Sequence, residues 1–146
     1  MMDKVLLVED NQALIDIYTI TFKHQNFSIE IAHDGEECLQ RVKTINPNII
    51  LLDVMMPKIN GIQTLERLKT DPETKNIPVI MLSNIVEANE EAKSKELGAL
   101  QYIIKSHHLP MEIVNITKEE LLKNRIQKPQ EQTSAIPPID NSQKNF

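Results

Sequence analysis

Short apolar runs alternate along the chain with longer segments in which apolar residues recur every three or four positions. The short runs are rich in Val, Ile and Leu, which favours buried strands, and the longer segments have the spacing of helices that bury one face. The expected strands lie near residues 4–8, 28–32, 49–53, 78–83 and 101–105. This alternation predicts an α/β fold with a five-stranded parallel sheet and helices on both faces.

Polar residues and prolines mark the expected helix ends. Asp10 or Asn11 is available to cap the first helix, and Asp34 to cap the second. The fourth helix, from Glu90 to Leu97, is short and weakly apolar, whereas Pro110 suits the first turn of the fifth. The apolar residues of the first and fifth helices are Leu14, Ile17, Tyr18, Phe22, Ile113, Val114, Leu121 and Leu122.

Composition changes after Ile126. Residues 127–146 contain four Gln, three Pro, two Asn and two Ser, with four scattered apolar residues. Such a segment buries too little surface to offset the entropy cost of ordering. We therefore expect one domain over residues 1–126, followed by a disordered tail or a linker at 127–146.

Charge and cysteine content indicate which partners and which cellular compartment to expect. The formal net charge is −5, which disfavours binding to the phosphate backbone of nucleic acids. A single cysteine, Cys38, excludes an intramolecular disulfide and suits a reducing compartment. Asp3 and Lys4 precede an apolar run too short for a signal peptide or a membrane span. We expect a cytoplasmic protein without direct contacts to nucleic acid or membrane.

Acidic residues follow two of the expected strands directly. Glu9-Asp10 comes after residues 5–8, and Asp53 after residues 49–52. Parallel strands end at the same edge of a sheet, so these three carboxylates should converge and repel one another. A hard divalent cation with oxygen ligands would relieve the repulsion, and Mg²⁺ is the expected ion.

Two further polar residues follow strands at the same edge, Ser83 and Lys105. Taken one at a time, these positions have simpler explanations: Asp10 as a helix cap, Asp53 as a turn residue, Ser83 as a loop hydroxyl and Lys105 as a solvated charge. Their joint occurrence at four strand ends favours a single site. The adjacent His107 and His108 diverge and suit a solvated loop better than a metal site.

These residues, in this order, make residues 3 to about 124 resemble the receiver domain of bacterial response regulators, including the single-domain chemotaxis type. The resemblance is carried by Glu9-Asp10, Asp53 with Met56-Pro57 and Gly61, Ser83, Tyr102 and Lys105. It implies a flavodoxin-like sheet with strand order 2-1-3-4-5.

The resemblance also implies the role of each residue. Asp53 would accept a phosphoryl group from a sensor histidine kinase or a histidine phosphotransfer protein. Asp10, Asp53 and the main-chain carbonyl of Met55 would hold Mg²⁺, with Glu9 acting through water. The remaining roles concern the phosphoryl group and the response to it: Lys105 would pair with its oxygens, the Ser83 hydroxyl would donate to it, and Tyr102 would turn inward when Ser83 moves.

Three positions depart from the usual family pattern. The acidic pair is Glu-Asp rather than Asp-Asp, and Ser83 replaces the frequent Thr. Ser106 follows Lys105 where the family usually has a proline with a cis peptide bond. A cis bond before a residue other than proline costs about 3–4 kcal/mol, so we expect a trans bond or a rearranged loop.

The favoured function is a phosphorylation-activated switch that is no enzyme beyond its own phosphorylation and dephosphorylation. Its output would be a contact with a downstream protein, with the chain a monomer or a phosphorylation-dependent dimer through the fourth helix, fifth strand and fifth helix. The chain could also be the N-terminal receiver of a longer regulator, cut within its linker. A magnesium-dependent aspartyl-phosphate phosphatase is disfavoured, because Asp53-Val54-Met55 lacks the second acid of an Asp-X-Asp pattern.

Overall fold

The computed structural model describes residues 2–85 and 87–126. They form five strands and five α-helices in strict alternation, with one short 3₁₀ helix (η1) before the last helix. The elements are β1 (Lys4–Val8), α1 (Gln12–His24), β2 (Ser28–Ala32), α2 (Gly35–Ile45), β3 (Ile49–Asp53), α3 (Gly61–Thr70), β4 (Val79–Ser83), α4 (Ala88–Glu96), β5 (Gln101–Ile104), η1 (Lys105–His107) and α5 (Pro110–Ile126). The prediction for residues 127–146 lies outside the described residues.

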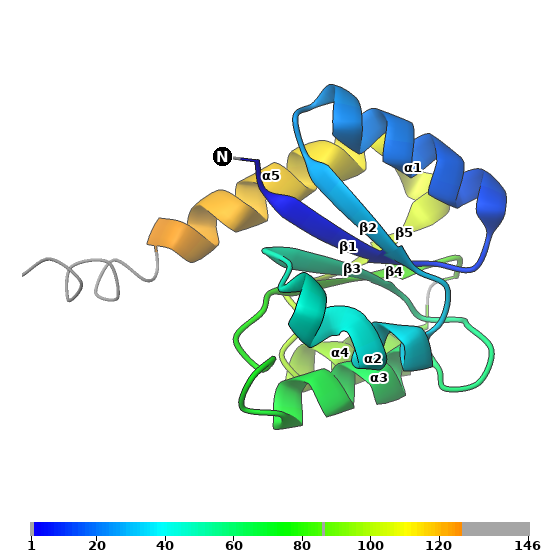
Figure 1. Ribbon diagram of the computed structural model, residues 1–146. Coiled ribbons are helices and arrows are strands. Elements are labelled where there is room, and N and C mark those ends of the chain that lie inside the picture. The colour runs from blue at the N-terminus through cyan, green and yellow to red at the C-terminus, as the bar shows by residue number, and fades with distance from the viewer. Residues whose placement is uncertain (1, 86, 127–146) are drawn as a thin grey trace, which may run out of the picture.

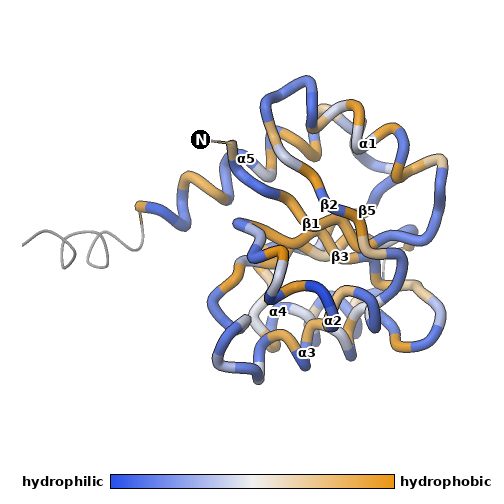
Figure 2. The backbone as a smooth tube through the Cα atoms, viewed as in Figure 1, coloured by the Kyte–Doolittle hydropathy of each residue, from blue (hydrophilic) through white to orange (hydrophobic). Residues whose placement is uncertain are grey.

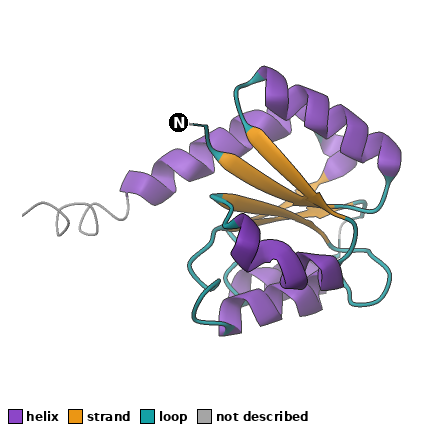
Figure 3. Ribbon diagram, viewed as in Figure 1, coloured by secondary structure: helices purple, strands orange, loops and turns teal. Residues whose placement is uncertain are grey.

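All neighbouring strands run parallel, in the order β2-β1-β3-β4-β5. Figure 1 shows α1 and α5 on one face of this sheet and α2, α3 and α4 on the other, and Figure 3 shows the same layers by element type. The predicted fold class and strand order are therefore confirmed. Crossovers by helices on both faces follow from the right-handed connection of parallel strands.

The sheet separates two apolar cores, because successive side chains of a strand point to opposite faces. The core beneath α2 and α3 includes Leu6, Leu52 and Leu65, and the core beneath α1 and α5 includes Leu7, Phe22 and Ile113. The tube in Figure 2 is correspondingly orange along the central strands and mixed along the helices. β3 and β4 are buried along their whole length, which explains their unbroken apolar runs.

Helices begin at the predicted positions where the sequence offers a polar capping residue. Asn11, and not Asp10, caps α1: its side chain accepts a hydrogen bond from the Leu14 N–H at 3.0 Å. Asp34 caps α2 as predicted, accepting from the Glu37 N–H at 2.8 Å. α4 begins at Ala88 and ends at Glu96, so the predicted range of Glu90 to Leu97 was displaced. Its first residue follows Glu87, whose side chain makes no capping hydrogen bond, so the boundary had no sequence signal.

Two of the apolar residues named for the first and fifth helices are exposed. The side of α1 that faces the sheet uses Ile15, Tyr18 and Phe22, which leaves Ile17 42% exposed. Leu122 is 57% exposed because α5 uses its neighbour Leu121, which is 4% exposed, to pack against the core.

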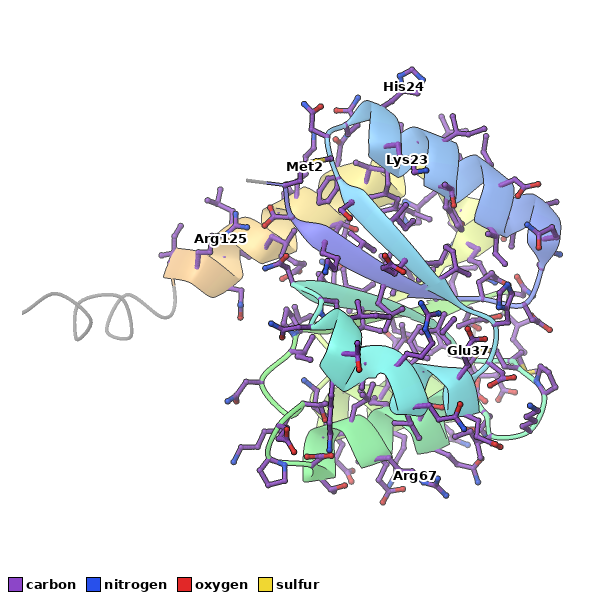
Figure 4. The ribbon with its side chains drawn as sticks, viewed as in Figure 1. Met2, Lys23, His24, Glu37, Arg67 and Arg125 are labelled. Carbon is purple, nitrogen blue, oxygen red and sulfur yellow. The ribbon has the colours of Figure 1, made fainter. Side chains whose placement is uncertain are left out.

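The extended end of α5 contacts the start of the chain. The guanidinium of Arg125 pairs with the carboxylate of Asp3, just before β1. Figure 4 accordingly shows Arg125 and Met2 at the same end of the molecule. None of the helices that the structure describes combines the length and the apolarity needed to cross a membrane.

β2 lies at one edge of the sheet and has β1 as its strand partner. The guanidinium of Arg41, on α2, donates a hydrogen bond to the main-chain carbonyl of Ile31. The same side chain forms ion pairs with Glu37 at 3.0 Å and with Glu30 at 3.2 Å. Arg41 therefore covers part of this edge.

Gly61 allows the start of α3 to pass close to the backbone beneath Asp53. A Cβ atom at this position would lie 2.3 Å from the Asp53 carbonyl oxygen and 2.7 Å from the Val54 Cα. Both are backbone atoms, so relief requires movement of the chain itself. Because Asp53 ends β3, the glycine supports the position of this carboxylate.

We expect Gly61→Ala to lower the free energy of unfolding by about 3 kcal/mol, since the added methyl overpacks a close backbone contact. Urea unfolding measures the change. Glu66→Ala, an exposed substitution in the same helix, is the matched control and should stay within about 0.5 kcal/mol of wild type. Equal stability of Gly61→Ala and the control would show that this backbone approach is looser than the structure has it.

Candidate functional site

The carboxyl ends of four strands bring the predicted site residues to one edge of the sheet. Asp53 and Ser83 are the last residues of β3 and β4, and Glu9 and Asp10 follow β1 directly. Lys105 comes directly after β5 and begins the 3₁₀ helix. The β3–β4 register pairs Asp53 with Leu82, next to Ser83. Open parallel sheets bind ligands at this edge.

Three acidic side chains form the centre of the site. Glu9, Asp10 and Asp53 each offer one carboxylate oxygen, and these oxygens lie within 4.8 Å of one another. Glu9 and Asp53 are 1% and 2% exposed, whereas Asp10 is exposed. An all-oxygen donor set that is open to water on one side suits a hard, partly hydrated cation such as Mg²⁺.

Lys105 is a buried cation that faces two of these acids. Its Nζ lies 2.8 Å from Glu9 Oε1 and 3.4 Å from Asp53 Oδ1, and the residue is 7% exposed. The simpler explanation of Lys105 as a solvated charge is therefore wrong. The other Glu9 oxygen accepts from the Asn11 N–H at 3.1 Å, so one glutamate connects the end of β1 to the end of β5.

The loop after β5 shows the conformation of the peptide bond between Lys105 and Ser106. The described residues contain no cis peptide bond, so the Lys105-Ser106 bond is trans, as expected. The chain then turns through the 3₁₀ helix, and the His108 N–H donates to the Lys105 carbonyl at 3.3 Å. In the described part of the chain, neither His107 nor His108 belongs to a cluster that could hold a metal.

The environment of Asp53 favours its neutral form. Burial raises the pKa of Asp53 to about 7 from an ordinary value of 3.8. The positive charge of Lys105 opposes the rise, the negative charge of Glu9 adds to it, and the Met55 N–H, donating to Oδ1 at 3.3 Å, lowers it. A change of charge beside the Asp53 carboxylate can therefore change its protonation state near neutral pH.

This pKa predicts a pH-dependent stability in chelator-containing buffer. Between about pH 4 and about pH 7 the folded protein holds a proton on Asp53 that the unfolded chain has released, so the free energy of unfolding falls as pH rises. At about 1.4 kcal/mol per pKa unit the loss reaches about 4 kcal/mol. Asp53→Asn should match wild type near pH 4 and be more stable near pH 8 by up to this amount, measured by urea unfolding. A stability difference that stays constant with pH would contradict the raised pKa.

Ser83 and Tyr102 are joined through a backbone carbonyl that the sequence did not indicate. The Ser83 hydroxyl donates to the Ile85 carbonyl at 2.9 Å and accepts from the Ile85 N–H at 3.2 Å. The Tyr102 hydroxyl lies 3.5 Å from the same carbonyl and 3.2 Å from Glu90 Oε1, on α4. Neither a main-chain group nor one glutamate in a polar helix carries a sequence signal.

Tyr18 is a second residue whose surroundings the sequence did not reveal. The helical pattern placed it on an apolar face, and its ring is buried against that core. Burial, together with the negative charges of Glu9 and Asp53, raises the pKa of Tyr18 to about 12. The phenol is therefore neutral over the working range of the site.

Residues 5–118 match the family described as response regulator receiver domain. A crystal structure of a CheY-like response regulator receiver domain protein from Methanospirillum hungatei JF-1 has a TM-score of 0.79, with 24% identity, over 87% of this chain and 99% of that chain. This likeness concerns the fold. The phosphorylated cyanobacterial phytochrome response regulator RcpA is 30% identical, with a TM-score of 0.75, over 84% of this chain and 95% of that chain.

Among curated proteins, the phosphate regulon transcriptional regulatory protein PhoB of Rhizobium meliloti (strain 1021) is 31% identical over 110 residues. The match covers 75% of this chain and 48% of that protein. The chain thus spans about half the length of the curated relatives it matches.

Proposed function

We propose a phosphorylation-activated switch as the function of this chain, which belongs to the response regulator receiver domain family of two-component systems. The observation that carries the proposal is the placement of Asp53. Its carboxylate ends a buried strand, has the Lys105 ammonium 3.4 Å away, and shares an acidic cluster with Glu9 and Asp10. A carboxylate in this position can act as a nucleophile toward an anionic group whose charge its neighbours offset.

In the proposed step, one Asp53 oxygen attacks the phosphorus of a phosphohistidine on a sensor histidine kinase or a histidine phosphotransfer protein. A P–O bond forms, the P–N bond breaks, and its electron pair returns to the histidine nitrogen. The product is an acyl phosphate on Asp53. Phosphoryl transfer needs little covalent help, so positioning and charge neutralisation supply most of the catalysis.

Lys105 would pair with the phosphoryl group from a place close to its present position. Its ammonium is held by Glu9 at 2.8 Å and lies near Asp53, so a short movement brings it to a phosphoryl oxygen. The Ser83 hydroxyl, which donates to the Ile85 carbonyl, would turn to donate to another phosphoryl oxygen. A departure of Ser83 from Ile85 would carry the chemical event to the loop after β4.

The acidic cluster fits the metal that receiver domains bind. Asp10, Asp53 and the main-chain carbonyl of Met55 would hold Mg²⁺ directly, and Glu9 would act through water. When bound, the ion would offset the approach of an anionic phosphoryl group to an anionic nucleophile. The partial exposure of the cluster supports weak, hydrated binding.

We propose a protein contact as the output, through the face built by α4, β5 and α5, either to a downstream target or to a second copy. Tyr102 supports this face, because it lies on β5 and its hydroxyl reaches α4. Transcriptional regulation is named for the Rhizobium meliloti protein, of which the match covers 48%, and it is not carried over to this chain.

Intact-mass measurement after incubation with Mg²⁺ and acetyl phosphate tests the proposal. We expect a single phosphate adduct that requires Mg²⁺ and disappears on standing through hydrolysis of the acyl phosphate. A protein that stays unmodified with both reagents, while a known receiver domain reacts in parallel, would overturn the proposed function.

A further inference from the structure

The Tyr102 hydroxyl is held between two acceptors on neighbouring segments. It lies 3.2 Å from Glu90 Oε1 on α4 and 3.5 Å from the Ile85 carbonyl. A phenol has one proton to donate, and a carboxylate is the stronger acceptor. The shorter distance to Glu90 agrees with this preference.

We infer that Glu90 is a positioning residue that holds the Tyr102 hydroxyl against α4 in the unphosphorylated protein and thereby opposes activation. The inference rests on the proposed function, because it concerns the resting state of that switch. It assigns a role to a residue of α4 that touches neither the acidic cluster nor Lys105 in the described contacts.

The hydrogen bonds form one connected path from the site to α4. Ser83 donates to the Ile85 carbonyl, the Tyr102 hydroxyl lies near that carbonyl, and Tyr102 reaches Glu90. When Ser83 turns toward a phosphoryl group, the Ile85 carbonyl loses its 2.9 Å donor and becomes a better acceptor for Tyr102. Moving fully to this carbonyl requires the tyrosine hydroxyl to leave Glu90.

The described side chains of α4 are mostly exposed, so a hydrogen bond from β5 is a large part of its side-chain contacts with the rest of the domain. Of its nine described residues, only Ser94 is buried, and its only apolar residues are two alanines. Its ion pairs, Lys95 with Glu91 at 3.5 Å and Lys93 with Glu96 at 3.8 Å, stay within the helix and are exposed. Exposed pairs of this kind contribute little. The Tyr102–Glu90 contact instead joins α4 to β5.

The effect of the Tyr102–Glu90 contact can be measured through the affinity for a ligand that binds the active state. An interaction that stabilises the inactive state lowers the apparent affinity for a ligand that selects the active state. Beryllofluoride, a phosphoryl mimic, is such a ligand. Removing the Glu90 carboxylate should therefore tighten beryllofluoride binding without any change at the acidic cluster.

The decisive experiment is a double-mutant cycle read out by beryllofluoride titration at saturating Mg²⁺. Glu90→Ala should lower the half-saturating concentration about threefold to tenfold, as expected for a partly exposed hydrogen bond to a charged group. Glu90→Gln, which keeps an acceptor oxygen, should fall between wild type and Glu90→Ala. In a Tyr102→Phe background, Glu90→Ala should have no further effect.

Glu91→Ala is the matched control. Glu91 lies in the same turn of α4 and carries the same charge, but its carboxylate pairs with Lys95. The control should bind beryllofluoride as wild type does. An equal shift in Glu90→Ala and Glu91→Ala, or a full Glu90→Ala effect without the tyrosine hydroxyl, would overturn the inference and leave a general charge effect.

A second readout needs no phosphoryl chemistry and separates this inference from the proposed function. In protein with labelled tyrosine rings, Glu90→Ala should shift the NMR signals of Tyr102, whereas the Tyr18 signals on α1 serve as an internal reference. Unchanged Tyr102 signals would overturn the inference even if the acyl phosphate forms. Absence of adduct and of beryllofluoride binding in wild type would instead overturn the proposed function.

Discussion

Asp53→Asn should abolish the phosphate adduct that wild type forms with Mg²⁺ and acetyl phosphate, as measured by intact mass. The amide has nearly the shape of the carboxylate but lacks the nucleophilic anion. Its fold should persist, because the substitution removes a buried group whose pKa is raised to about 7. The loss therefore reports on chemistry and not on unfolding.

Asp16→Asn is the control for this substitution, since Asp16 is an exposed carboxylate on α1 that accepts a hydrogen bond from Gln12. It should form the adduct as wild type does. The result most damaging to the assignment would be an adduct that persists in Asp53→Asn and maps by peptide analysis to Asp10, the exposed member of the acidic cluster.

Lys105→Met should reduce both stability and phosphorylation. Removing the ammonium leaves Glu9 and Asp53 buried without their cation, a change that typically costs about 3–5 kcal/mol. The cost should be largest near pH 8 and shrink toward pH 5, because the Asp53 carboxyl, whose pKa is raised by burial, can then hold a proton. Adduct formation should fall by about a hundredfold or more, since one preorganised cation is lost.

Two further variants make the Lys105 result specific. Lys95→Met removes an exposed lysine of α4 and should change stability by no more than about 0.5 kcal/mol. Glu9→Gln combined with Lys105→Met removes one of the two buried carboxylates together with their cation, so it should recover part of the stability at pH 8 and none of the phosphorylation. Equal stability of Lys105→Met and wild type at pH 8 would show that Lys105 is not the counterion of the buried acids.

The sequence was sufficient for the sheet and for the edge at which the polar residues gather. The central strands are short apolar runs, and in a parallel sheet the residue at the end of such a run lies at the carboxyl edge. Asp53 and Ser83 end strands whose every residue is buried, so the transition from apolar to polar in the sequence coincides with the edge of the sheet. Asp34 and Pro110 located helix ends because their signals act within one turn.

What the sequence could not provide depends on contacts between distant segments. Lys105 and Glu9 are 96 positions apart, and their pairing at 2.8 Å requires β1 and β5 to deliver both side chains to the same place. The exposure of Ile17 depends on which side of α1 faces the sheet, and both choices fit the helical period. The link from Ser83 to Tyr102 runs through the main-chain carbonyl of Ile85. Every residue type has this group, so the sequence carries no sign of the link.

The covering of β2 by Arg41 has a consequence for how the protein behaves in a crowded solution. The Ala32 carbonyl accepts the Glu9 N–H, so by alternation along the strand the Ile31 carbonyl points outward, toward solvent. Exposed groups of this kind are templates on which a foreign strand can add, and aggregation of sheet proteins begins at such edges. Arg41 occupies that acceptor, and its charge is held in place by Glu30 and Glu37. A side chain of α2 thereby blocks one of the positions at which a foreign strand could pair with β2.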